Sequence, residues 1–299
     1  MLDLTVTAGL PLALDGGLRL VVPPGAGNER PAVRTLGEMR PYLADPDAHG
    51  PAEMYFMYRD LGRSADRDAY GPFGVRFDVT VIIPGAVSGE LVKTAGHYHP
   101  APSGQDGGPA TTPGDRVDVS FPEVYGVIHG RAHYLLQDGR VDGPSRAFLV
   151  EAEAGEVVLV PPNFGHVTIN PGPGPLVMAN WVEASFASVY GPYAERRGAC
   201  YYEFAGAGEG GWVGGKGGEG RVEPNPRYPA VPLERLSAPT FAALCPPGED
   251  LWRAVKLDGR ASGRSGPRPL YDLGVTEPQR LTFLTRPAAY DWGGLVGRR

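Results

Sequence analysis

Short strand-like runs separated by turn residues fill most of this chain and limit it to a mostly β fold. The runs are rich in β-branched and aromatic residues, and Gly, Pro, Asn or Asp bound most of them. They occupy residues 18–22, 52–59, 75–83, 123–129, 133–137, 156–160, 166–170 and 175–183. Strands of this length and spacing are typical of a β-sandwich or barrel. We therefore expect an all-β fold with a few short helices.

Two segments stand apart from this pattern. Residues 100–122 are polar and rich in Gly, Pro and Thr, which predicts a long inserted loop between two strands. After about residue 230 the strand pattern stops, and the stretch 233–245 predicts a helix with Ser237 as its N-cap. We expect one domain over 1–230 that contains the inserted loop, followed by a C-terminal extension over 231–299.

Charge and composition exclude several classes of partner. The net charge of -6 argues against general affinity for nucleic acid or anionic membranes. No apolar stretch approaches the length of a membrane span, and the N-terminus has no basic region before Arg19. Cys200 and Cys245 are the only cysteines, too few and too far apart for a disulfide framework. We expect a cytoplasmic protein that acts on a small molecule.

Four residues form a candidate metal site. His97 and His99 follow a strand-like run and, two positions apart, share one face of an extended chain. Glu123 begins the run 123–129, and His166 begins the run 166–170. Three imidazoles and one carboxylate suit a divalent transition metal that keeps open positions for water or substrate.

The spacing around these residues resembles the two sequence motifs of the cupin superfamily. The first motif is H-x-H, a spacer, then E-x6-G, and the second is G-x5-P-x-G-x2-H-x3-N. The matching positions are His97, His99, Glu123, Gly130, Gly155, Pro161, His166 and Asn170. The chain departs from the pattern in two places: Asn163 stands where the second motif has Gly, and the spacer before Glu123 is far longer than usual. The resemblance implies a cupin fold, a double-stranded β-helix or jelly-roll barrel.

Longer blocks narrow the resemblance to the cupin-type glucose-6-phosphate isomerases, first known from archaea. TAGHYH, EVYGVIHGRAHYLLQ and VVLVPPNFGHVTINPG carry it, and RTLGEMRPYL, FDVTVIIPG and SVYGPYAERRG follow in matching order. It covers roughly residues 30–228, without the 100–122 loop or the tail. It implies a metal-dependent aldose–ketose isomerase of glycolysis and gluconeogenesis that interconverts glucose 6-phosphate and fructose 6-phosphate.

The resemblance also implies roles for individual residues. Thr80, Thr94, the backbone N–H of Gly96 and Tyr190 would hold the phosphate. Glu123 would be both a metal ligand and the carrier of the proton between C1 and C2, through a cis-enediol. A metal-assisted hydride shift, with Glu123 mainly a ligand, stays open. Tyr125, two residues after Glu123, shares its face and is expected to line the same cavity.

Several alternatives stay open. The substrate could be another sugar phosphate such as mannose 6-phosphate. The site could instead be that of an Fe(II) cupin dioxygenase. In the third alternative, the chain binds a sugar phosphate without catalysing a reaction. Fe(II) is the metal that the resemblance favours, with Mn(II), Ni(II) or Zn(II) as alternatives. Because cupins commonly pair through an N-terminal strand, we expect a homodimer.

Overall fold

The computed structural model describes residues 1–102, 119–139, 143–206, 220–261, 263 and 266–296 of the chain. Its largest sheet has six antiparallel strands, and all eight runs predicted as strands contribute to the described sheets. In order across the sheet, the strands are β12 (Val157–Val160), β9 (Glu123–His129), β14 (Leu176–Glu183), β6 (Val75–Ile82), β5 (Glu53–Tyr58) and β4 (Ala32–Thr35).

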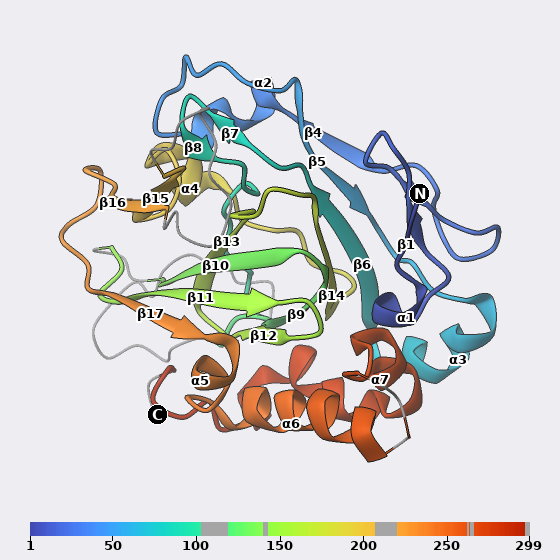
Figure 1. Ribbon diagram of the computed structural model, residues 1–299. Coiled ribbons are helices and arrows are strands. Elements are labelled where there is room, and N and C mark those ends of the chain that lie inside the picture. Colours follow the sequence, from blue (N-terminus) through green and yellow to red (C-terminus); the bar gives the residue numbers. More distant parts are fainter. Residues whose placement is uncertain (103–118, 140–142, 207–219, 262, 264–265, 297–299) are drawn as a thin grey trace.

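A four-stranded sheet faces the first one (Figure 1). Its strands, in order, are β13 (Phe164–Ile169), β10 (Arg131–Asp138), β11 (Ala147–Glu153) and β17 (Leu233–Ser237). β17 runs parallel to β11, whereas the other neighbours are antiparallel. The prediction of a mainly β fold with short helices is confirmed, although the described strands form separate sheets rather than one closed barrel.

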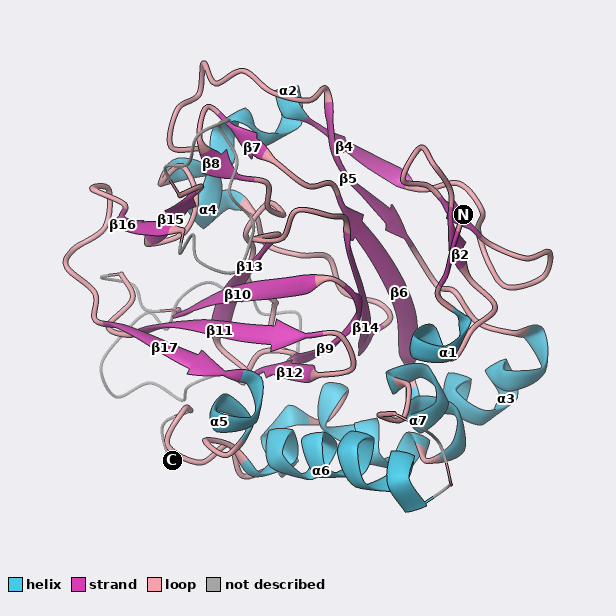
Figure 2. Ribbon diagram, viewed as in Figure 1, coloured by secondary structure: helices cyan, strands magenta, loops and turns pink. Residues whose placement is uncertain are grey.

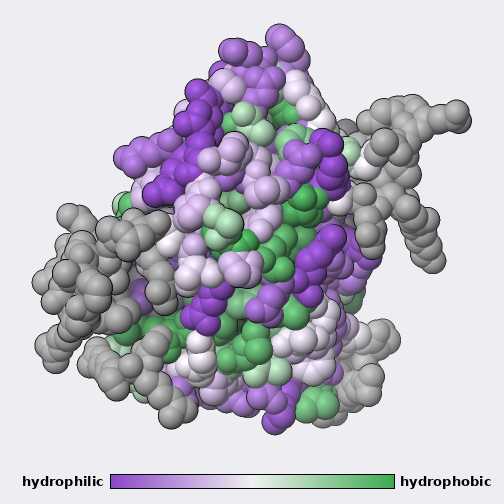
Figure 3. Space-filling view, turned by 90° about the vertical axis from the view of Figure 1, so that its left-hand side faces the viewer, coloured by the Kyte–Doolittle hydropathy of each residue, from purple (hydrophilic) through white to green (hydrophobic). Residues whose placement is uncertain are grey.

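The remaining strands of the described residues form two small sheets. One contains β16 (Arg221–Pro224), β15 (Tyr201–Phe204), β8 (Glu90–Leu91) and β7 (Ala86–Val87). The other, at the N-terminus, contains β1 (Leu2–Asp3), β2 (Ala13–Leu14) and β3 (Leu20–Val21). On the side of the molecule where β15 and β16 lie, hydrophobic residues gather in a band between hydrophilic ones (Figure 3).

The helices are short, and most gather at one end of the molecule (Figure 2). They are α1 (Thr5–Ala8), α2 (Leu36–Met39), α3 (Arg67–Tyr70), α4 (Gly191–Glu195), α5 (Ala238–Ala242), α6 (Pro246–Ala261) and α7 (Leu270–Thr276). Short 3-10 helices span Arg40–Tyr42, Ser64–Asp66, Gly71–Phe73, Pro278–Leu284 and Pro287–Ala289. Thr35 and Glu38 form a capping box at the start of α2, in which the Thr35 hydroxyl accepts from Glu38 N–H while the Glu38 carboxylate accepts from Thr35 N–H. None of the helices in the described part of the chain is long and apolar enough to cross a membrane.

The predicted helix with Ser237 as its N-cap is present as α5, but the residues before Ser237 form a strand. Leu233–Ser237 is strand β17, because pairing with β11 outweighs the helix propensity of its Leu, Glu and Arg residues. The helix α5 begins only at Ala238, and the Ser237 side chain bonds the Thr240 hydroxyl rather than a backbone N–H. The division of the chain into 1–230 and 231–299 stays a prediction. Of the predicted loop 100–122, residues 103–118 lie outside the described residues.

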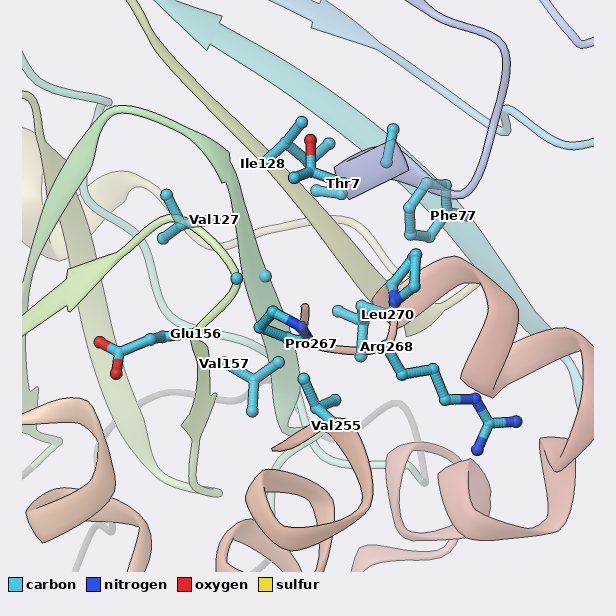
Figure 4. Close-up of a pocket in the computed structure, with 15 residues that line it drawn as sticks. Thr7, Phe77, Val127, Ile128, Glu156, Val157, Val255, Pro267, Arg268 and Leu270 are labelled. Carbon is cyan, nitrogen blue, oxygen red and sulfur yellow. The ribbon is translucent and has the colours of Figure 1, made fainter. Parts of the chain in front are cut away.

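The C-terminal helices cover the outer face of the six-stranded sheet. α6 packs on β12, and α7 packs on β14 and α3. Buried apolar residues from Leu4 to Val296 belong to one core cluster, which therefore includes side chains of the tail. A small cavity remains between the sheet and the tail, where Figure 4 shows Phe77, Val157, Val255 and Leu270 around it. This cavity lies on the side of the sheet opposite to the polar residues described next.

Candidate metal centre

His97 and His166 face each other across a short antiparallel bridge between the segment 93–98 and β13. Their backbones exchange two hydrogen bonds, with N···O distances of 3.3 Å from His97 N and 3.1 Å from His166 N. This pairing sets their rings 4.4 Å apart, measured between centroids. His99, two residues further along, lies 5.1 Å from the ring of His97, as the shared face of an extended chain requires.

Glu123, the first residue of β9, closes the group. Its Oε2 lies 3.3 Å from His99 Nε2 and 3.2 Å from His166 Nε2. One possible ligand atom from each of His97, His99, Glu123 and His166 lies within 4.8 Å of the others. Glu123, His99 and His166 are 4%, 3% and 1% exposed, so these three side chains are shielded from bulk water, whereas His97 is half-buried. The structure thus brings together four side chains that the sequence spreads over seventy positions.

Hydrogen bonds at Nδ1 orient two of the imidazoles. His99 Nδ1 lies 2.9 Å from the carbonyl oxygen of Phe121, and His97 Nδ1 lies 3.4 Å from that of Ala95. A carbonyl oxygen can only accept, so each Nδ1 carries a proton and, in a neutral ring, Nε2 presents a lone pair. The buried Nδ1 of His166 has no hydrogen-bond partner among the described residues.

These contacts fit a bound cation. His99 Nε2 and His166 Nε2 both lie close to Oε2 of Glu123, at 3.3 Å and 3.2 Å, so possible ligand atoms of three residues converge. A divalent cation can be held by ligand atoms that converge in this way. The donor set of three nitrogens and one carboxylate suits Fe(II), Mn(II), Ni(II) or Zn(II), and the backbone carbonyls at Nδ1 are the usual partners of metal-binding histidines.

The protonation states match those that metal ligands need. Burial, and then the neighbouring His166 and His99, hold the pKa of His97 well below its ordinary value. Burial likewise lowers the pKa of His166. Burial would raise the pKa of Glu123, but the contacts with His166 and His99 outweigh it and keep that pKa well below the ordinary value. Near neutral pH, therefore, these two imidazoles are neutral and the carboxylate is ionised.

The group lies at the wall of a cleft that is partly open to solvent. Of the residues predicted to bind substrate, Thr80, Thr94, Tyr125 and Tyr190 line it. The Tyr125 hydroxyl lies 3.1 Å from His166 Nε2, and burial and then Glu123 hold the pKa of Tyr125 well above its ordinary value. Thr94 Oγ1 accepts from Thr168 N–H at 3.0 Å.

Gly96 is placed differently from the other predicted substrate residues. It is not among the residues that line the cleft. A Cβ at this position would lie 2.0 Å from Cδ1 of Tyr193, so the position needs glycine for packing against that ring. The predicted contact of its N–H with phosphate stays a prediction.

Sequence reasoning missed several polar residues of the cleft. Arg59 and Arg76 line it and share the buried carboxylate of Asp78, with N···O distances of 2.6 Å and 3.0 Å. Asn180 also lines it, is 3% exposed, and has no partner for Nδ2 among the described residues. A signal for Arg76 was present, because Arg76, Asp78 and Thr80 alternate along one strand and must share a face.

The sequence of this chain is similar to that of a known enzyme family. The sequence profile of the family described as glucose-6-phosphate isomerase (GPI) matches residues 33–216. Glucose-6-phosphate isomerase of Thermococcus litoralis is 30% identical over 175 residues, which cover 56% of this chain and 78% of the relative. The enzyme of the same name from Thermococcus onnurineus is 28% identical over 225 residues, covering 74% and 97%.

Similarity to solved structures is weak. An oxalate decarboxylase of Bacillus subtilis, described with Mn(II) centres, matches 47% of this chain and 29% of its own, with 22% identity and a TM-score of 0.30. An oxalate oxidase bound to glycolate matches 40% and 47%, with 18% identity and a TM-score of 0.29. Such low scores bear on neither the site nor the reaction. The match of the family profile to well over half of the chain is decisive: this chain belongs to the glucose-6-phosphate isomerase family and is an isomerase.

Proposed function

We propose that this chain is a metal-dependent aldose–ketose isomerase that interconverts glucose 6-phosphate and fructose 6-phosphate. Family membership supports the reaction. The observation that carries the proposal is the convergence of His97, His99, Glu123 and His166 at a cleft that also contains hydroxyl groups and arginines. Both halves of the substrate then have partners: the sugar carbons near the four-residue group, and the phosphate among the polar donors.

The four-residue group would hold one divalent ion, Fe(II) by preference, with Mn(II), Ni(II) or Zn(II) as alternatives. Bound there, such an ion supplies Lewis-acid polarisation to sugar oxygens. Neutral imidazoles and an ionised carboxylate are the forms in which this chain's residues would bind it. Removing the ion is expected to leave a folded but inactive enzyme.

Glu123 would carry the proton. Conversion of the aldose into the ketose takes hydrogen from C2 and adds hydrogen to C1, while one proton passes from the C2 oxygen to the C1 oxygen. An ionised carboxylate can accept the first proton and return it to the neighbouring carbon, through a cis-enediol. In the alternative, a hydride passes directly from C2 to C1 and Glu123 only contributes charge and position.

The remaining residues of the cleft would hold the substrate. Thr80, Thr94 and Tyr190, with the N–H of Gly96, would donate to the phosphate. The Tyr125 hydroxyl, which keeps its proton because its pKa is raised, would donate to a sugar oxygen. Arg59 adds positive charge at the same cleft, which favours an anionic ligand. A cytoplasmic location stays a prediction from the sequence, and a homodimer stays a prediction from the family resemblance.

The test is an isomerase assay on chelated and reconstituted protein. Chelated protein should be inactive, and addition of Fe(II) under anaerobic conditions, Mn(II), Ni(II) or Zn(II) should restore interconversion of glucose 6-phosphate and fructose 6-phosphate. Mannose 6-phosphate in parallel establishes whether the sugar is correctly assigned. Activity that survives complete chelation contradicts metal dependence, and absence of isomerisation with every metal contradicts the reaction. Oxygen consumption by Fe(II)-loaded protein would then favour the dioxygenase alternative.

A further inference from the structure

The two departures of this chain from the cupin motifs meet in space. One is the long spacer before Glu123, whose last described residues include Ser120. The other is Asn163, at the position where the second motif has Gly. Ser120 N–H donates to Asn163 Oδ1 at 2.9 Å, and Asn163 N–H donates to Ser120 Oγ at 2.7 Å. The two residues thus exchange a pair of hydrogen bonds across 43 positions of the sequence.

The backbone of Asn163 explains only part of its presence. Its φ of +66° lies in the left-handed region, where Gly is unstrained and Asn is among the best tolerated other residues. Gly would therefore satisfy the backbone at least as well. What Gly lacks is the side-chain oxygen that accepts from Ser120, so the reciprocal pair accounts for Asn where conformation alone does not.

The residue after Ser120 is in direct contact with the metal centre. The Phe121 carbonyl accepts from His99 Nδ1 at 2.9 Å, and Phe121 N–H donates to the carbonyl of Pro100 at 2.9 Å. The Phe121 ring stacks on Phe186, whose ring lies 4.4 Å from that of His99. Two residues later the chain reaches Glu123. The position of the Ser120–Phe121 backbone therefore determines the carbonyl that orients His99.

We propose that the Asn163–Ser120 pair is a positioning device for the metal centre, which takes the place of the short spacer found in other cupins. It fixes the returning end of the inserted segment so that the Phe121 carbonyl holds the proton of His99 on Nδ1 and leaves Nε2 for a metal. The inference deepens the proposed function and rests on it for the metal, but not for the tautomer of His99.

The most direct variant is Asn163→Gly, which restores the residue of the motif. It removes the bond from Ser120 N–H to Asn163 Oδ1 but keeps the backbone N–H that donates to Ser120 Oγ. Gly also suits the left-handed backbone, so the variant is expected to fold. Ser120→Ala removes the hydroxyl from the other side of the pair. Each single change removes one bond of the pair and the double variant removes both, so the double variant is expected to bind metal at least as weakly as either single one.

Ser88→Gly is the matched control. Ser88 is also a non-glycine residue with positive φ, +46°, and its hydroxyl likewise accepts from a backbone N–H, that of His49 at 3.0 Å. It lies in the turn between β7 and β8 and does not line the cleft. This variant loses an equivalent contact without touching the metal centre.

The experiment is titration of each chelated protein with Mn(II), followed by calorimetry and electron paramagnetic resonance. Asn163→Gly and Ser120→Ala should bind Mn(II) about 10–100-fold more weakly than wild type, the usual loss when a partner of a ligating histidine is disturbed. Ser88→Gly should bind as wild type does. Wild-type affinity in Asn163→Gly would overturn the proposal.

A second readout separates this inference from the metal centre itself. Nitrogen-15 spectra of histidine-labelled, metal-free protein report which ring nitrogen of His99 carries the proton. Wild type should show the Nδ1–H form, and Asn163→Gly a mixture of both tautomers. If wild type fails to bind Mn(II) but this tautomer shift occurs, the proposed metal function fails and the positioning role stands. An unchanged His99 tautomer in Asn163→Gly would contradict the positioning role whether or not metal binds.

Discussion

The two faces of the six-stranded sheet are built from alternate residues of the same strands, yet they differ in polarity and in what covers them. On β14, Met178, Asn180 and Val182 point into the cleft, and the residue between the last two, Trp181, points away. The inner face gathers carboxylate, imidazole, amide and hydroxyl groups around the cleft. The outer face is apolar and closed by the C-terminal helices.

Trp181 shows what holds the outer face together. It is fully buried, its Nε1–H donates to the carbonyl of Leu270 at 3.0 Å, and its ring stacks on Tyr271 with an interplanar angle of 14°. Tyr70 contacts it edge-on from α3. Gly274 of α7 approaches so closely that a Cβ there would lie 2.4 Å from Cε2 of the Trp181 ring. The tail thus acts as part of the core rather than as an appendage to it.

Because side chains alternate along each strand, the same strands provide both the polar cleft and the apolar packing surface. On the inner face, the buried Asn180 Nδ2 has no partner within the described part of the chain, which is unfavourable unless a ligand or water accepts from it. Residues on the outer face bury apolar area, which stabilises the fold. Changes on the inner face should therefore alter activity and spare stability, and changes on the outer face should do the reverse.

The largest effect is expected for Glu123→Gln on the inner face. Loss of the proton carrier should lower kcat by about 10²–10⁴-fold, with little change in melting temperature. Steady-state kinetics together with metal content measure it, because metal loss must be separated from loss of the base. Glu153→Gln, at an exposed carboxylate on β11, is the control. A fall in kcat of less than about tenfold in metal-loaded protein would contradict proton transfer by Glu123 and favour the hydride shift.

Trp181→Ala tests the outer face. Removing this fully buried ring should lower the free energy of unfolding by about 3–5 kcal/mol, whereas Trp181→Phe, which keeps a ring but loses the bond to Leu270, should cost about 1–2 kcal/mol. Denaturant unfolding measures both. KM for glucose 6-phosphate should stay near the wild-type value in the folded protein. A loss of catalysis without a loss of stability would contradict the claim that the outer face affects stability and not activity.

Thr80→Val is expected to have a moderate effect on the inner face. It keeps the β-branched shape on β6 but removes a hydroxyl that donates to the phosphate in our proposal, so KM should rise about tenfold, equivalent to about 1.4 kcal/mol. Thr168→Val on β13 is the matched control, because the buried Thr168 hydroxyl has no partner among the described residues and lies outside the cleft lining. An equal rise of KM in both variants would contradict a hydrogen bond between the Thr80 hydroxyl and the phosphate.

The smallest effect concerns the cysteines. Burial raises the pKa of Cys200 to about 12 and that of Cys245 to about 11. Both are therefore thiols at pH 8, and native protein should not react with a thiol-disulfide reagent that labels both residues after denaturation. Since these pKa values are raised in the folded state, their contribution to stability is complete below about pH 8.5 and is lost as pH rises through 11 to 12. Rapid labelling of native protein would contradict the burial of either residue.

Local patterns predicted the strands and the four-residue group well. β-Branched and aromatic runs identified β6, β9 and β14, and the two motifs identified the residues that converge at the metal centre. β11 was missed because its sequence, AFLVEAE, mixes good helix formers with apolar residues, and only pairing with β10 and β17 makes it a strand.

Contacts between distant segments had no local signal. The packing of α7 on β14 joins residues about 90 positions apart, such as Trp181 and Leu270. The hydrophobic pattern of either segment alone does not predict which segment it packs against. The same holds for Ser120 and Asn163. Asn163 was visible as a departure from the motif, but only the fold places Ser120 beside it and gives the departure a physical reason.

Anomalous diffraction from crystals of the Mn(II)-loaded protein tests the central claim most directly. The account predicts one strong anomalous peak per chain, bounded by the side chains of His97, His99, Glu123 and His166 on the inner face of the sheet. Absence of a peak at that position in protein that has taken up Mn(II), or a peak elsewhere in the chain, would contradict it.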